Sequence, residues 1–279
     1  GWTITENATT TGSTTLSALS SFTLASGRTL SVAGAFTNSV GGASTTWSGS
    51  TLSLESGSYS INTKLQSGDS YGTLRVGANA DIRMWFSTST AYVVNTSGSL
   101  YSQDHDGVDG DLYIWGNYER TSGTEYWSYA TDFDGTALTG NERQVHVRFS
   151  DSASAMIISS ALQMVGTSSA TTTVANQGSG TYLFEVSGST LNAQYYQVRN
   201  TNVAGLSISG SSTITSLANG DFELGTNGGS LMTVASTTIN HNPALQIQNV
   251  RFATSSGITS GINVTQSDAT PASYWWFRN

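Results

Sequence analysis

The sequence predicts an all-β protein, a single-domain parallel β-helix with coils of about 22 residues. The first observation is an internal repeat: TLSV at 29–32, TLSL at 51–54 and TLRV at 73–76 are spaced by 22 residues. The second is that each unit alternates polar and apolar residues, which is typical of a β-strand. The third is that no stretch of ten residues keeps the 3.6-residue periodicity of a helix.

Stacked coils would place equivalent apolar residues on top of one another inside the molecule. We expect two such interior ladders in the first repeat, Leu30–Leu52–Leu74 and Val32–Leu54–Val76.

The repeat returns with looser spacing in FEVSGSTL (184–191), LSISGSSTI (206–214) and MTVASTTI (232–239). Their aligned residues Val186, Ile208 and Val234 are 22 and 26 residues apart, and GINV at 261–264 begins a further unit. On this period the chain would form roughly ten to twelve coils. An antiparallel β-sandwich also uses short strands and frequent turns, and it remains the alternative.

The composition limits the class of protein. Only 10% of residues are charged, while 45 Ser and 40 Thr carry small hydroxyls. Seven Trp, 12 Tyr and 9 Phe together with alternating strands argue against disorder. The net charge of −8 argues against nucleic acid as a partner, and no apolar run reaches the roughly 18 residues of a membrane span. The chain lacks Cys, which excludes the small disulfide-framed class of secreted proteins. It begins at Gly1 rather than Met, so we expect a segment excised from a longer chain.

One segment, residues 102–144, interrupts the repeat. It holds nine of the 18 acidic residues and a group of Tyr, Trp and Phe. We therefore expect one domain over residues 1–279, with an acidic, aromatic-rich loop insertion around 102–144.

The sequence DHDGVDGD at 104–111 is the candidate metal site. Closely spaced carboxylates on a turning backbone provide the oxygen ligands that Ca²⁺ prefers. The expected ligands are Asp104, Asp106, Asp109 and Asp111. The loop is not an EF-hand, because Trp115 occupies the twelfth position from Asp104. The alternative is a solvated turn, since Asp-Gly is a common turn dipeptide.

A catalytic interpretation is possible but weaker. Asp132 and Asp134 could form the carboxylate pair of a glycoside hydrolase, and Arg143 and Arg148 could bind an acidic sugar chain. The sequence shows no clear cluster of cations for a lyase. We expect no enzyme, with a carbohydrate-active enzyme as the runner-up.

Several stretches resemble the very large repetitive surface proteins of uncultured candidate-phyla bacteria. They are HDGVDGDLYIWGNY, TEYWSYATDFDGTAL, NGDFELGTNGGSL and SYWWFRN. The resemblance implies a β-helical piece of a giant secreted or cell-surface protein. It does not imply an activity or a functional role for any particular residue. The expected function is a non-catalytic, extracellular structural or adhesive segment. The alternative is a carbohydrate-binding or carbohydrate-active β-helix.

The two termini of the sequence predict the partners. The opening GWTIT alternates like a strand, and Tyr274, Trp275, Trp276 and Phe277 form a run of aromatics near the end. Neither stretch has the polar character of a cap. We expect association with further segments of the parent chain or end to end with copies of itself, and glycans as a further partner. The alternative is that the aromatics fold back and plug the last coil.

Overall fold

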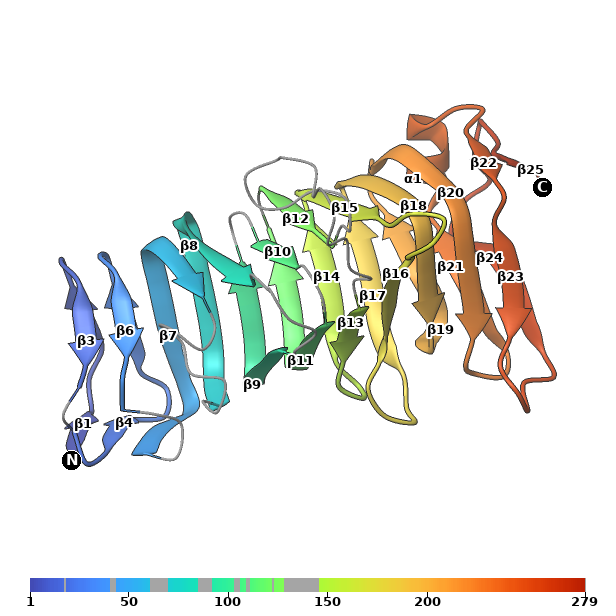
Figure 1. Ribbon diagram of the computed structural model, residues 1–279. Coiled ribbons are helices and arrows are strands. Elements are labelled where there is room, and N and C mark those ends of the chain that lie inside the picture. Colours follow the sequence, from blue (N-terminus) through green and yellow to red (C-terminus); the bar gives the residue numbers. More distant parts are fainter. Residues whose placement is uncertain are drawn as a thin grey trace.

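The computed structural model describes residues 1–17, 19–40, 44–60, 70–84, 92–102, 106–108, 111–121, 123–127 and 146–278. In these residues the regular secondary structure is β-strand apart from one short helix. Successive passages of the chain lie side by side along one axis, with the N- and C-termini at opposite ends (Figure 1).

The elements have the following bounds in chain order: β1 Trp2–Ile4, β2 Ala8–Thr10, β3 Thr14–Leu16, β4 Phe22–Leu24, β5 Thr29–Val32, β6 Phe36–Asn38, β7 Thr45–Ser60, β8 Ser70–Met84, β9 Tyr92–Ser102, β10 Asp106–Val108, β11 Asp111–Arg120, β12 Thr124–Tyr126, β13 His146–Phe149, β14 Ser154–Ile158, β15 Ala161–Val165, β16 Thr172–Asn176, β17 Tyr182–Ser187, β18 Thr190–Arg199, β19 Thr201–Ser209, β20 Thr213–Leu224, β21 Gly229–Val234, α1 Ser236–His241, β22 Gln246–Gln248, β23 Arg251–Thr254, β24 Gly261–Gln266 and β25 Trp276–Arg278.

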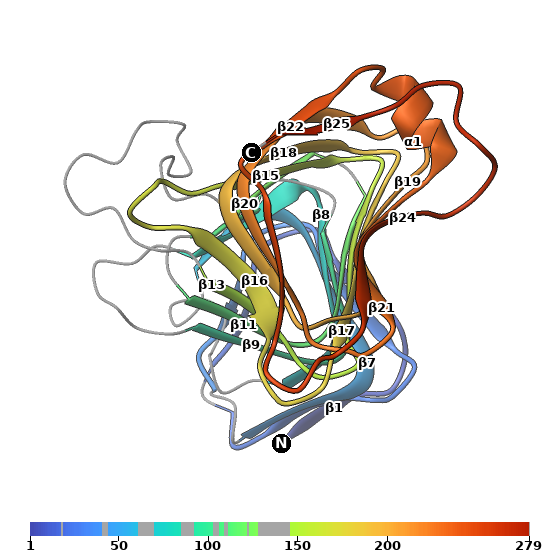
Figure 2. The same cartoon turned by 90° about the vertical axis from the view of Figure 1, so that its right-hand side faces the viewer.

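The strands form three rows, which the view along the axis shows as three sides of the molecule (Figure 2). Row A begins with β1 and β4 and ends with β13, β16 and β23. Row B contains β2, β5, β14, β17, β19, β21 and β24. Row C contains β3, β6, β10, β12, β15, β22 and β25. The long strands bend across corners: β9, β11, β18 and β20 each contribute to two rows, and β7 and β8 contribute to all three.

Every pairing between described strands is parallel. We call the stretch of chain between a residue and its register partner on the next strand of the same row a coil. The pairing is parallel because every coil passes through the three rows in the same direction. The all-β, parallel arrangement is therefore confirmed, and the antiparallel sandwich does not fit it.

The predicted Leu ladder is confirmed. Leu30 pairs with Leu52, and Leu52 pairs with Leu74; all three side chains are buried. The same row of partners continues in both directions without a gap, through Ala8, Leu30, Leu52, Leu74, Leu100, Tyr118, Ala155, Phe184, Leu206, Met232 and Val264. The second repeat is in the expected register as well, with Val186 beside Ile208 and Ile208 beside Val234.

The coil length is not constant. The spacing of 22 residues holds as far as Leu74, but the step from Tyr118 to Ala155 is 37 residues and the step from Met232 to Val264 is 32. The rows remain in register across both steps.

The corners explain how one strand can serve two rows. Asn219 has φ +52° between the row C and row A parts of β20, and Asn249 has φ +53° between β22 and β23. Asn tolerates this left-handed conformation better than other side chains. Asn249 Nδ2 also donates to Asn219 Oδ1 at 3.0 Å, which links successive coils at this corner.

Helix α1 was not expected from the sequence. It begins within the MTVASTTI unit, which was predicted to have the same structure as the units FEVSGSTL and LSISGSSTI. The carboxylate of Asp268, on the following coil, accepts a hydrogen bond from the Ser236 amide at 2.6 Å, and this bond lowers the pKa of Asp268. The first amides of a helix have no acceptor within the helix, and the Asp268 carboxylate provides one for the amide of Ser236.

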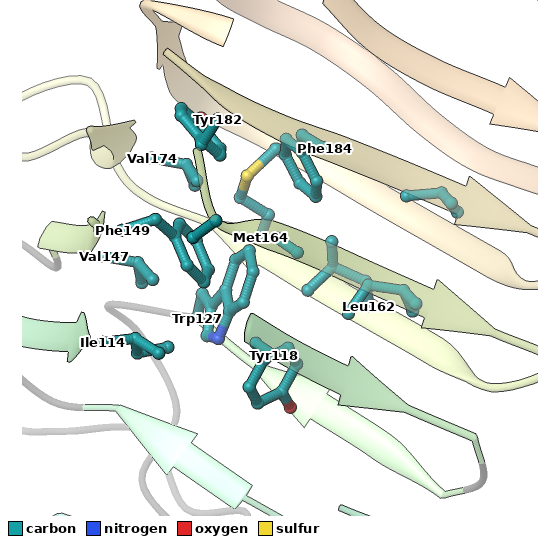
Figure 3. Packing of buried hydrophobic residues seen from close by; sticks show 14 of the residues in the cluster. Ile114, Tyr118, Trp127, Val147, Phe149, Leu162, Met164, Val174, Tyr182 and Phe184 are labelled. Carbon is teal, nitrogen blue, oxygen red and sulfur yellow. The ribbon is translucent and has the colours of Figure 1, made fainter. Parts of the chain in front are cut away.

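Aromatic rings fill much of the core. Phe184 lies 5.9 Å from Trp127 and 6.3 Å from Tyr182, measured between ring centroids (Figure 3). Burial raises the pKa of the Tyr182 and Tyr196 hydroxyls well above the usual range, so both remain neutral. The prediction of one domain with an insertion around 102–144 stays a prediction.

Candidate functional site

The four aspartates of the predicted calcium site do not all fall in the described part of the chain. Asp104 and Asp109 lie outside the described residues. Asp106 begins β10 and is the register partner of Glu125 on β12, in row C. Asp111 begins β11 and is the register partner of His146 on β13, in row A. The backbone thus places the two described aspartates on different rows.

Of the residues named for catalysis, Asp132, Asp134 and Arg143 lie outside the described residues. Arg148 lies on β13, between the buried residues Val147 and Phe149, so its side chain points outward. It is the starting point of a surface that the sequence did not reveal.

That surface, the charged face, is the outer side of row A. Outward-facing residues of successive coils fall into two parallel lines there. One line is His146, Thr173, Gln197, Asp221 and Arg251. The other contains Arg148 and, further along, the register partners Arg199, Glu223 and Ala253. Three of the ten cations of this acidic chain therefore gather on one side of the molecule.

The charges are joined from coil to coil. Arg251 Nη2 lies 2.6 Å from Asp221 Oδ2, and Arg199 Nη2 lies 3.9 Å from the same oxygen. Arg199 Nε lies 3.5 Å from Glu223 Oε2. The hydrogen bond to Asp221 raises the pKa of the Arg251 guanidinium, and the Coulomb attraction of that carboxylate adds to the effect.

The chemistry of the charged face suits a polar ligand. Guanidinium groups bind carboxylates and hydroxyls through several N–H donors in one plane, and the neighbouring carboxylates accept hydrogen bonds. Arg251 is 65% exposed and Arg199 is 37% exposed, so a ligand can reach both. Such partly exposed ion pairs contribute little to stability, which leaves them free to exchange partners.

A second charged group is closed to solvent. Arg120 and Glu125 are 0% and 1% exposed, and Arg120 Nη1 lies 3.1 Å from Glu125 Oε2. Tyr118 Oη donates to the same oxygen at 2.5 Å, and Trp127 Nε1 donates to Glu125 Oε1 at 2.6 Å. We call these four residues the buried ion-pair cluster.

The cluster lies in the interior ladders themselves. Tyr118 follows Leu100 in the Leu ladder, and Arg120 is the register partner of Ile157. Thr172 Oγ1 also donates to the backbone carbonyl of Trp127 at 3.0 Å, which ties the cluster to row A. Full burial keeps substrates away from this group, so its role is structural.

A third feature is the last coil. A hollow of about 680 Å³ lies there, lined by Val250, Phe252, Ile262, Val264 and Phe277 among others. Trp275 packs partly into the core and donates from Nε1 to the carbonyl of Asn242 at 3.0 Å. Of the other three aromatics predicted as a plug, Tyr274 is 61%, Trp276 45% and Phe277 45% exposed. The aromatics therefore cover this coil only in part.

Within the described ranges, no three His, Cys, Asp or Glu side chains are grouped so that they could hold a metal ion. The same ranges contain no helix long and apolar enough to cross a membrane. No protein-family model, curated protein or solved structure matches the chain.

Proposed function

We propose that the chain is a parallel β-solenoid, or β-helix, which serves as a non-catalytic structural or adhesive segment of a large extracellular surface protein. The unbroken interior ladder from Ala8 to Val264 supports this proposal most strongly. A core that repeats along one axis makes an elongated, stiff body whose sides are available for contact.

The outer side of row B supports the same role. Its line of register partners begins with Thr9, Ser31 and the buried Ser53 and ends with Ser207, Thr233 and Thr265. Between these two groups lie Arg75, Tyr101, Glu119, Met156 and Glu185. The small hydroxyls near the two ends of this line give a hydrated surface there, which suits a stalk or fibre.

The charged face also supports the alternative function, a carbohydrate-binding or carbohydrate-active β-helix. Asp221 and Glu223 lie two residues apart on the outer side of β20, next to Arg199. A pair of carboxylates is the group that most glycoside hydrolases use. The same residues can instead bind a glycan without cleaving it, which is the adhesive role.

Incubation of the purified chain with neutral and acidic polysaccharides separates these functions. We expect no new reducing ends and no unsaturated sugar ends. If the parent chain binds a polysaccharide, Arg199→Gln, on the charged face, should lose that binding. Arg28→Gln should keep it, because the Arg28–Glu6 ion pair lies on the first coils. Cleavage that is lost in Glu223→Gln would instead establish the enzyme.

Calcium binding by Asp104, Asp106, Asp109 and Asp111 remains part of the proposal. A cation that binds only the folded chain stabilises it by mass action. We expect millimolar Ca²⁺ to raise the melting temperature relative to chelator, and Asp106→Asn with Asp111→Asn to remove the increase. Identical melting curves with Ca²⁺ and with chelator would mean that the cluster is a polar turn.

A further inference from the structure

Four side chains of the charged face carry charges that balance one another. They form a chain of ion pairs in the order Arg251, Asp221, Arg199 and Glu223, so each guanidinium lies beside a carboxylate. The two positive and two negative charges sum to zero, while the whole chain carries a net charge of −8. An anionic ligand therefore finds no excess of positive charge at these four residues, and the field of the whole protein repels it.

An anionic ligand would also have to compete with carboxylates that are held in place. Asp221 Oδ2 lies 2.6 Å from Arg251 Nη2 and 3.9 Å from Arg199 Nη2. Glu223 is fixed from the next coil by Ser255 Oγ, which donates to Glu223 Oε1 at 2.8 Å. A ligand carboxylate or sulfate at either guanidinium would lie next to one of these acids, and such like-charge contacts oppose binding.

Two polar atoms among these ion pairs have no hydrogen-bond partner within the described residues. One is Asp221 Oδ1, which needs a donor, and the other is Arg199 Nε, which lies 3.5 Å from Glu223 Oε2 without a hydrogen bond to it. The two side chains are neighbours, because Arg199 Nη2 lies 3.9 Å from the other oxygen of Asp221. A covered carboxylate oxygen without a donor is unfavourable, so a ligand that supplies a donor stabilises this arrangement.

A hydroxyl group suits both atoms. It has one hydrogen to donate to Asp221 Oδ1, and its oxygen accepts from the N–H of Arg199 Nε. An ionised acid can only accept, so it would leave Asp221 Oδ1 without a donor. Protein atoms cover the two sites, but the Arg251 side chain is 65% exposed and its surface ion pair is weak, so it can move aside to admit a hydroxyl.

We infer that the charged face binds uncharged polysaccharides through their hydroxyl groups and does not bind acidic ones, an inference that rests on the adhesive role proposed above. Neutral groups continue this surface along the axis. Gln197 precedes Asp221 in the same line, and Thr173 Oγ1 donates to Gln197 Oε1 at 3.3 Å. Because the coils repeat at the strand spacing, a linear sugar chain that lies along the axis can contact several of them.

Isothermal titration calorimetry with three dissolved polymers tests this inference. A β-glucan and a mannan are the neutral probes, and alginate is the acidic probe. We expect the parent chain to bind a neutral polymer and not alginate, and added salt to leave the neutral binding unchanged. Arg199→Gln should weaken the neutral binding roughly tenfold or more, since it removes hydrogen bonds from a charged group.

Glu223→Gln tests the balance of charges directly. It removes one carboxylate and leaves Arg199 with excess positive charge, so we expect alginate binding to appear and to disappear again as salt is added. Glu185→Gln is the matched control, because Glu185 Oε1 accepts from Ser209 Oγ of the next coil at 3.1 Å but lies on row B. This control changes the net charge of the chain equally and should bind all three polymers like the parent.

Four results would overturn the inference. They are a parent chain that binds alginate more tightly than the neutral polymers, a parent chain that binds none of the three, neutral binding that Arg199→Gln leaves intact, and an equal gain of alginate binding in Glu185→Gln. None of these results involves new sugar ends. A failure of this inference is therefore distinguishable from a failure of the proposed non-catalytic function, which cleavage of a polysaccharide would reveal.

Discussion

Glu125→Gln is expected to lower the free energy of unfolding by about 3–5 kcal/mol, because it leaves the Arg120 guanidinium buried without its counter-charge. The carboxylate also accepts hydrogen bonds from Tyr118 and Trp127, one on each oxygen. An amide has only one acceptor oxygen, so Gln cannot accept both in the same way. Chemical denaturation followed by circular dichroism measures the loss.

Glu6→Gln is the matched control, since it breaks the Glu6–Arg28 pair at the surface. Solvent-exposed ion pairs contribute little, so this change should have almost no effect. The double variant Arg120→Leu with Glu125→Leu should regain part of the stability, because it removes both buried charges together. A Glu125→Gln chain as stable as the control would show that the buried ion-pair cluster does not stabilise the fold.

Leu52→Ala is expected to cost about 2–5 kcal/mol, the range for a large-to-small change in a packed core. Leu52 is 1% exposed and lies between Leu30 and Leu74 in the ladder. Because each coil contacts mainly its neighbours, hydrogen exchange should accelerate most in the strands that hold these three residues.

Ser31→Ala provides the comparison, since Ser31 alternates with Leu30 and points outward on the same strand. Its effect should stay within about 0.5 kcal/mol. Equal losses for the two variants would mean that Leu52 does not lie in an interior ladder.

The sequence predicted the ladders only where similar short units recur at a similar spacing. Leu30, Leu52 and Leu74 were identifiable because each lies at the same position of a 22-residue unit. Tyr118 and Ala155 belong to the same ladder, but 37 residues separate them, and no spacing rule links them. Parallel pairing in the structure establishes that connection, because it needs only register along the rows and not equal coil lengths.

The charged face and the buried ion-pair cluster could not be predicted for a related reason. Arg199 and Glu223 alternate with apolar residues in an ordinary strand pattern, and only the register of the coils brings their charges together. Alternation likewise does not reveal that Arg120 faces inward, because its partner Glu125 comes from the next strand. Helix α1 depends on Asp268, which follows it by about one coil.

The central claim is that every coil, whatever its length, advances the chain by one strand spacing along a single axis. Because the chain has no Cys, spin labels can be placed on introduced cysteines without interference. Outward residues of row B suit this purpose, in the pairs Ser31 with Ser207 and Thr9 with Thr265. The first pair is separated by seven register steps and the second by ten.

Pulsed electron paramagnetic resonance on these two doubly labelled chains measures the distances directly. At about 4.8 Å per step, the labels should lie about 34 Å apart in the first pair and about 48 Å apart in the second, allowing for the length of the label linkers. Two similar distances, or a second distance shorter than the first, would contradict a continuous stack of coils.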